Sequence, residues 1–294
     1  MDRRLIYRIA GAQSGITIYE FIKAKGFSHQ ILVELKRTEA GILQNGIPAK
    51  PYQRLEEGDL LELFLKEQPG KENIEPVPLE LAVVYEDEDI LVVNKPADMP
   101  IHPSQNNHGN TLANACMWYF QQKGEAFVYR CINRLDRDTT GLVLLAKNPF
   151  SASLLSGQME RREIHRTYLA VVEGELPSFG VIDAPIARKE GSAVERCVDP
   201  KRGERAVIYY ERLDCKKGYS LARIWLETGR THQIRVHMTS IGHPLPGDFL
   251  YNPGNRAIAR QALHSARLEF QHPISGEALS FAAALPEDMK MLLL

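Results

Sequence analysis

Apolar residues recur along the chain with two different periods, and these periods predict its elements. Spacings of three and four residues over 16–22 and 30–37 are typical of amphipathic helices, and Ser28 is well placed to cap the second one. Asn45-Gly46 predicts a two-residue hairpin turn, because both central residues of a type I′ turn need positive φ. Alternation over residues 60–65 then predicts a strand.

A polar stretch containing proline and glycine, residues 68–78, separates this first unit from the remainder of the chain. Such composition is typical of a linker, and 294 residues are more than one ordinary domain needs. We therefore expect a small α/β domain at 1–66, a linker at 67–78 and a larger domain at 79–294.

The larger domain shows many strand patterns and few helical ones. Helices are expected at 111–120, capped near Asn110, and at 151–159. Strands are expected at 81–85, 90–94, 142–146, 166–172, 206–213, 219–226 and 262–270. Because strands and helices do not alternate steadily, the pattern favours an α+β fold with a mixed, largely antiparallel sheet and flanking helices.

Composition narrows the class of protein. A hydrophobic content of 44% and a charged content of 25% are those of a globular protein. The first residues lack a sustained apolar stretch, and the four cysteines have no paired spacing, so we expect a cytoplasmic protein without disulfides. A monomer is the default expectation.

The net charge of −1 is low for a nucleic-acid binder, but nine arginines could line a cleft: Arg130, Arg134, Arg137, Arg161, Arg162, Arg166, Arg223, Arg230 and Arg235.

The densest charge lies just before the apolar run 142–146. Arg134, Asp136, Arg137 and Asp138 precede Thr139-Thr140-Gly141. Charges at the start of a buried strand are unfavourable unless each has a partner or a function. A surface loop of solvated ion pairs is the alternative interpretation of this segment alone.

Other blocks rich in polar side chains occur along the larger domain. A lysine and two prolines stiffen residues 94–103, and a tyrosine-bearing strand pattern covers 166–174. Residues 226–237 carry more hydrogen-bond donors than a core needs, after a glycine, Gly229, that permits a tight turn. Residues 242–248 and 263–273 continue the series.

In this order, the blocks resemble those of the RluA-type pseudouridine synthases, the ribosomal large-subunit type, over residues 80–290. The chain has Asn133 where that family usually has histidine, Thr140 where serine is common, and Asp98 where glycine is typical. The first unit is similar to an alpha-L type RNA-binding domain in degenerate form, with few basic residues around its second helix. A small structural appendage is the alternative.

The resemblance implies an isomerase that converts uridine to pseudouridine in RNA and uses base flipping. It makes Asp136 the catalytic residue, Arg235 its ion-pair partner through a bidentate fork, and Tyr168 the residue that stacks on the uracil. It further implies that Arg134, Lys95 and Arg230 contact phosphates or bases, and that His232 and Gln233 also bind the RNA. No cofactor is expected. No metal is expected either, because the arginines of residues 226–237 would repel a cation near His232 and His237.

Two other functions remain open at this point. A non-catalytic RNA-binding module could retain the fold, and a glycosidic hydrolase would need a second carboxylate, for which Asp138 is a poor match. Large-subunit ribosomal RNA is the expected substrate, with transfer RNA as the alternative.

Overall fold

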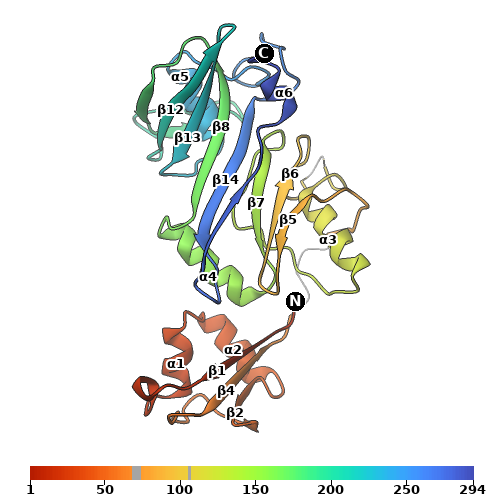
Figure 1. The fold of residues 1–294 in the computed structure, drawn as a ribbon, viewed down its shortest axis with the longest axis vertical. Helices are drawn as coiled ribbons and strands as arrows, with labels where there is room; N and C mark the ends of the chain where they lie inside the picture. Colours follow the sequence, from red (N-terminus) through yellow and green to blue (C-terminus); the bar gives the residue numbers. More distant parts are fainter. Residues whose placement is uncertain (68–73, 105–106) are drawn as a thin grey trace.

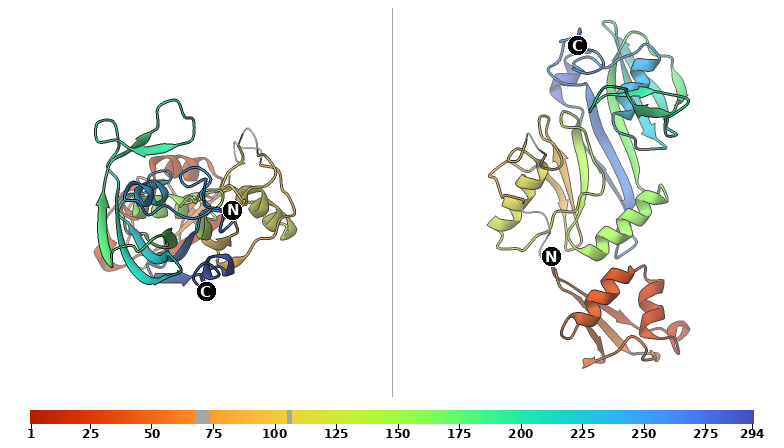
Figure 2. Two further views of the ribbon diagram at one scale, coloured as in Figure 1. Left: turned by 90° about the horizontal axis from the view of Figure 1, so that it is seen from above. Right: turned by 180° about the vertical axis from the view of Figure 1, so that it is seen from behind.

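The computed structural model describes residues 1–67, 74–104 and 107–294. Its described strands form a four-stranded sheet, a nine-stranded sheet and a separate two-stranded ribbon. Figure 1 shows the small sheet at one end of the molecule and the large sheet above it, and Figure 2 shows the same arrangement from behind. Half of the expected linker, residues 68–73, lies outside the described residues. No helix in the described ranges is long and apolar enough to cross a membrane.

The small unit packs two capped helices against an antiparallel sheet of order β1-β4-β2-β3. Ser28 accepts a hydrogen bond from the amide of Ile31, which confirms the expected cap, and Asn45 and Gly46 both have positive φ, of 54° and 76°. Strand β1 is not apparent from the sequence because Leu5 alone among its residues is buried. The elements are β1 (Arg3–Arg8), α1 (Ile18–Ala24), α2 (His29–Arg37), β2 (Ile42–Gln44), β3 (Ile47–Pro48) and β4 (Leu60–Leu65).

The large sheet has the order β5-β6-β7-β14-β8-β13-β12-β9, and β15 pairs with β14. Only β7 and β14 are parallel among its described pairs, so the predicted mixed, largely antiparallel α+β fold is confirmed. Its strands are β5 (Val83–Glu86), β6 (Ile90–Lys95), β7 (Thr140–Ala146), β8 (His165–Glu173), β9 (Phe179–Asp183), β12 (Val207–Lys216), β13 (Tyr219–Leu226), β14 (Leu263–Gln271) and β15 (Ala278–Ala282).

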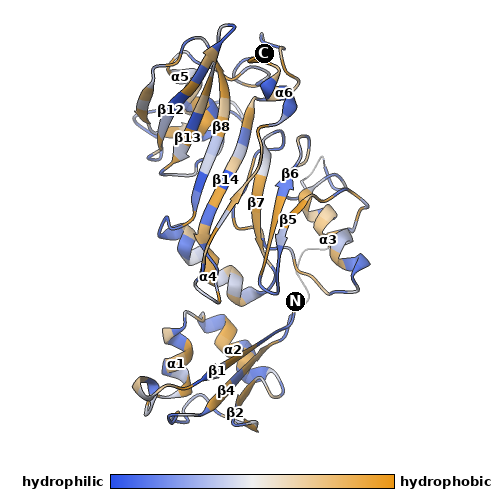
Figure 3. Cartoon of the chain, viewed as in Figure 1, coloured by the Kyte–Doolittle hydropathy of each residue, from blue (hydrophilic) through white to orange (hydrophobic). Residues whose placement is uncertain are grey.

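Helices lie on both faces of this sheet and bury its centre. Every residue of β7 is buried, and alternate residues enter two different cores. One core includes Phe120 of α3 (Leu112–Gln122) and the other Leu155 of α4 (Pro149–Glu160). Figure 3 shows the resulting continuous apolar colouring of β7. Thr111, one residue later than expected, caps α3.

Several short elements were not predicted. They are β9 and β15, the ribbon of β10 (Ile186–Arg188) and β11 (Arg196–Val198), and the helices α5 (Gln233–Ser240) and α6 (Glu287–Lys290). Most have few residues or a weak alternation of buried and exposed positions. Helix α5 was missed for another reason: its buried face contains Gln233, Arg235 and His237 and therefore lacks an apolar stripe.

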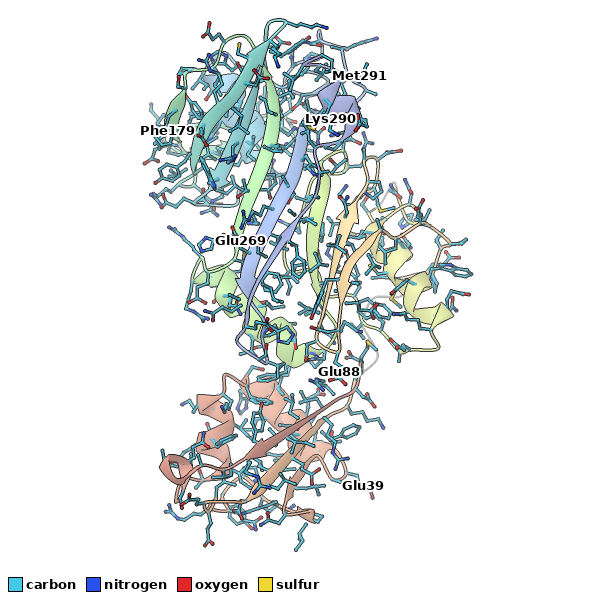
Figure 4. The ribbon with its side chains drawn as sticks, viewed as in Figure 1. Glu39, Glu88, Phe179, Glu269, Lys290 and Met291 are labelled. Atoms are coloured by element: carbon cyan, nitrogen blue, oxygen red, sulfur yellow. The ribbon has the colours of Figure 1, made fainter. Side chains whose placement is uncertain are left out.

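The small unit contacts the large one through an aromatic pair and an ionic cluster. The Phe27 ring stacks on Phe150 of α4 with 3.7 Å between centroids. The Arg3 guanidinium bonds both carboxylate oxygens of Asp89, at 3.0 and 2.9 Å, and also pairs with Glu88. Figure 4 labels Glu88 at this junction. These contacts join the first strand to the loop between β5 and β6.

Candidate active site

The charged segment forms a loop that enters β7 at the centre of the large sheet. Its turn is closed by a hydrogen bond of 3.1 Å from the Thr139 amide to the Asp136 carbonyl. Gly141 has φ of 112°, and a β-carbon there would lie 2.2 Å from the Ser265 carbonyl oxygen on β14. Glycine is therefore required where β7 and β14 approach each other. The sheet centre consequently determines where the Asp136 loop begins.

Asp136 lies beside the buried Arg235, 99 positions later in the chain. Arg235 Nη1 donates to Asp136 Oδ2 at 2.9 Å. The Asp136 side chain is 26% exposed and that of Arg235 only 2%. The two residues expected to pair are thus brought together, with the carboxylate on the solvent side of the guanidinium.

The expected bidentate fork is formed with a different carboxylate, which corrects the sequence interpretation. Arg235 Nε and Nη2 donate to the two oxygens of Asp248, at 2.7 and 2.8 Å, so a single bond remains for Asp136. Asp248 is fully buried and also accepts hydrogen bonds from the amides of Leu250 and Tyr251. Asp248 could have been suspected from the sequence only by reasoning that Arg235, if buried, needs a second counter-charge.

Two carboxylates keep Arg235 charged despite its burial. Burial by itself lowers the pKa of Arg235, but the hydrogen bonds and charges of Asp248 and Asp136 outweigh this and raise it above its ordinary value. A permanently positive group therefore lies behind Asp136. The arrangement holds this carboxylate at a fixed position through the bond from Arg235 Nη1.

Tyr168 and Asp136 line the same small cavity, of about 70 Å³, together with Arg235 and Ile234. Tyr168 lies on β8 with its side chain in the core beneath this cavity. Burial raises the pKa of Tyr168 above its ordinary value, so the phenol is protonated at neutral pH. Tyr168 and the Asp136 carboxylate therefore lie at the same cavity.

The turn before α5 places His232 near Asp136. The Gln233 side chain instead forms hydrogen bonds that stabilise this turn. His232 has a left-handed backbone with φ of 57°, and its Nε2 lies 4.0 Å from Asp136 Oδ2. Burial lowers its pKa, and its Nδ1 contacts the Tyr251 hydroxyl at 2.9 Å. Gln233 accepts from the Arg230 amide and Thr228, and donates to the Val207 carbonyl, so its polar atoms are already used.

A larger cleft of about 1010 Å³ adjoins the cavity. Arg134 and Arg230 line both, as expected for residues that contact RNA. The anticipated clustering of arginines is only partial: Arg130 pairs instead with Glu67, and Arg223 pairs with Glu211. The cleft arginines are Arg134, Arg137, Arg162, Arg166 and Arg230.

The position of Lys95 does not fit the expected phosphate contact. Only 1% of its surface is exposed, and its ammonium donates to the carbonyls of Pro96, Met99 and Arg137 at 2.7–2.9 Å. All three protons of the ammonium are therefore engaged. Lys95 connects its own loop to the loop that carries Asp136.

The three departures from the family pattern have structural explanations. Asn133 is buried and bonds the backbone of β7, accepting from the Leu144 amide and donating to the Leu142 carbonyl. Thr140 places its hydroxyl 2.8 Å from His264 Nδ1. Asp98 has φ of 53°, a conformation that glycine adopts without strain, which accounts for the usual glycine at this position.

The two histidines considered for metal binding do not face a common point. His232 contacts Tyr251, whereas His237 Nε2 contacts the Ala184 carbonyl. Within the described residues, one group of carboxylates and histidine has ligand spacing, namely Asp87, Asp89 and His272. Their oxygens already bond backbone amides, Arg3 and Asn148, so this group belongs to the junction with the small unit.

Comparison with known proteins agrees with this arrangement. The model of the RNA pseudouridylate synthase family matches residues 89–240. The chain is 39% identical over 281 residues to an uncharacterized RNA pseudouridine synthase, YjbO, of Bacillus subtilis, covering 95% of this chain and 98% of that protein. It is 43% identical over 241 residues to ribosomal large subunit pseudouridine synthase D of Zymomonas mobilis, covering 76% and 75%.

A solved structure shows the same fold. Human RNA pseudouridylate synthase domain containing 1 superimposes with a TM-score of 0.59 at 26% identity, over 74% of this chain and 86% of that one. The chain belongs to the RNA pseudouridylate synthase family. It is an RNA-modifying isomerase of the RluA type.

Proposed function

We propose that this enzyme isomerises one or a few uridines in large-subunit ribosomal RNA, with Asp136 as the catalytic residue. The observation that carries the assignment is a carboxylate held by a buried arginine in a cavity that adjoins an arginine-lined cleft. Relatives named as ribosomal large subunit pseudouridine synthase D support the choice of RNA. Transfer RNA remains the alternative substrate.

The reaction breaks the bond from ribose C1′ to uracil N1, turns the base and joins C1′ to C5; C5 then loses its proton and N1 takes one up, so the composition is unchanged. The Asp136 carboxylate can act as nucleophile or base in this sequence, and Arg235 holds it in position. Tyr168 is placed to lie against the flipped uracil. Because its phenol is protonated, it can donate a hydrogen bond to a base oxygen. The target base must leave its stack to reach these groups.

The carboxylates around the cavity favour an isomerase over a hydrolase. A glycosidic hydrolase needs a second carboxylate flanking the bond. Asp138 forms a fork with Arg137, and Asp248 is fully buried against Arg235. Neither is available on the open side of Asp136.

The test is to map pseudouridine by carbodiimide modification and reverse-transcription stops in total RNA from cells with and without the gene. Loss of one or a few stops in ribosomal RNA, restored by the wild-type gene but not by Asp136→Asn, is the expected result. Loss confined to transfer RNA would correct the substrate. No change in either RNA would favour a non-catalytic RNA-binding module.

We further propose that residues 1–66 form an RNA-binding domain joined by residues 67–78 to the catalytic domain at 79–294. A hollow of about 850 Å³ on the small unit is lined by basic and aromatic side chains, among them Tyr52, Lys50 and Arg37. Such surfaces suit single-stranded RNA. Tyr52→Ala should weaken RNA binding while kcat stays unchanged.

The four unpaired cysteines fit a cytoplasmic location, and we retain a monomer as the working assumption.

A further inference from the structure

Most arginines of the cleft already have a carboxylate partner. Arg162 pairs with Glu227 at 2.9 Å, Arg230 pairs with Glu204, and Arg137 pairs with Asp138 at 2.9 Å. Two cleft arginines, Arg134 and Arg166, form no ion pair with any residue that the structure describes. Uncompensated guanidinium groups in a cleft are suited to bind an anion. Arg134 belongs to the expected RNA-binding set, whereas Arg166 has no assigned role.

Arg166 lies where the cleft meets the cavity. It lines both, and it precedes Tyr168 by two positions on β8, so the two side chains share one face of the sheet. The side chain is half-buried, and its Nε is buried without a hydrogen-bond partner among the described residues. The guanidinium also interacts with the Tyr168 hydroxyl, but no carboxylate among the described residues balances its positive charge, so an anion supplied from outside the chain could do so.

The turn at Gly229 is shaped to accommodate this guanidinium. A β-carbon at Gly229 would lie 3.3 Å from Arg166 Nη2, closer than ordinary contact. The φ of Gly229 is not in the left-handed region. Gly229 therefore borders the Arg166 guanidinium with no side chain between them.

We propose that Arg166 binds a phosphate of the RNA strand at or next to the target uridine and so holds the flipped nucleotide over Asp136. A phosphate matches the fork of a guanidinium and neutralises its charge, which the uncharged uracil cannot do. The inference rests on the proposed function, because it assumes that the target base occupies the cavity. Arg166 is then a substrate-binding residue distinct from Arg235.

The test measures isomerisation by tritium release from in vitro transcribed large-subunit ribosomal RNA labelled at uridine C5, over a series of salt concentrations. Arg166→Met should lower kcat/KM roughly 10-fold, mainly through KM. The slope of log(kcat/KM) against log[salt] should become shallower by about 0.7 to 0.9, as for one lost phosphate contact. Arg166→Lys keeps the charge and should retain the wild-type slope.

Arg161→Met is the matched control. Arg161 is a neighbouring exposed arginine that pairs with Glu163 and does not line the cleft. Its removal should leave KM and the slope unchanged. An unchanged slope in Arg166→Met, or a loss confined to kcat, would overturn the inference and would indicate that Arg166 acts only on the neighbouring Tyr168.

Failure of the proposed function has a different signature. If wild type releases no tritium from this RNA, ribosomal RNA is not the substrate, and filter binding of transfer RNA transcripts, the alternative substrate, decides the inference instead. A shallower salt slope of the binding constant in Arg166→Met than in wild type would then support the phosphate site. Equal slopes would reject it.

Discussion

The floor and the rim of the active-site cleft use arginine in opposite ways. At the floor, Arg235 is 2% exposed and is fixed by three hydrogen bonds to two carboxylates. At the rim, Arg162 is 57% exposed and has a single ion pair. A buried, doubly paired charge positions its partner before the substrate arrives. An exposed pair contributes little and can exchange its carboxylate for a phosphate. Under the proposed function, the deep arginine would serve the chemistry and the exposed ones would serve RNA binding.

The largest effect is expected at the floor. Asp136→Asn preserves the shape of the side chain but removes its charge, so kcat should fall on the order of 10³-fold or more. The unfolding free energy should change by less than about 1 kcal/mol, because Arg235 keeps its fork on Asp248. Tritium release and urea unfolding measure the two quantities. Turnover near that of wild type would remove Asp136 from the mechanism.

The next largest effect is expected at Asp248, which holds Arg235 in place behind Asp136. Asp248→Asn leaves the buried guanidinium without its fork, and the unfolding free energy should fall by about 3 kcal/mol. Displacement of Arg235 should also lower kcat on the order of 10²-fold.

A second fork provides the control for Asp248. Arg260 bonds both oxygens of Asp288 at 2.7 and 2.8 Å, at the start of the C-terminal helix α6. Asp288→Asn should destabilise the protein while kcat remains within about twofold. If Asp248→Asn lowered stability but left kcat at the wild-type value, the fork would have no role in positioning Asp136.

Lys95 joins the loop after β6 to the loop that carries Asp136. Its contribution to the unfolding free energy should depend on pH. Burial lowers the pKa of Lys95 to about 7. Between that value and its ordinary pKa the unfolded chain binds more protons than the folded one, so this group makes stability rise with pH. The difference in unfolding free energy between wild type and Lys95→Met should therefore increase from pH 7 to pH 10. A difference independent of pH would show that Lys95 stays charged in the fold.

The smallest effect is expected at the rim. Arg162→Met removes an exposed arginine that already has a partner, so kcat/KM should fall by no more than about threefold. Direct comparison with Arg166→Met under the same salt conditions sharpens the contrast between paired and unpaired rim arginines. Equal losses in the two variants would mean that ion pairing does not distinguish them.

Local pattern sufficed wherever neighbouring residues decide the outcome. The Asn45-Gly46 turn, the Ser28 cap and the continuous apolar run of β7 follow from steric and hydrogen-bonding rules that act over a few positions. Short or half-exposed strands such as β15 carry too little alternation to be recognised. Helix α5 escaped because charged and polar side chains occupy its buried face.

The sequence by itself determined the fold class and the family, which are carried by ordered motifs, and the resemblance to that family implied the pairing of Asp136 with Arg235. Only the tertiary structure decided that the Arg235 fork belongs to Asp248, that Lys95 is buried against three carbonyls, and that Arg166 Nε has no hydrogen-bond partner among the described residues. The reason is that a charge acts on whatever lies within a few ångströms, and folding brings those neighbours together from distant parts of the chain.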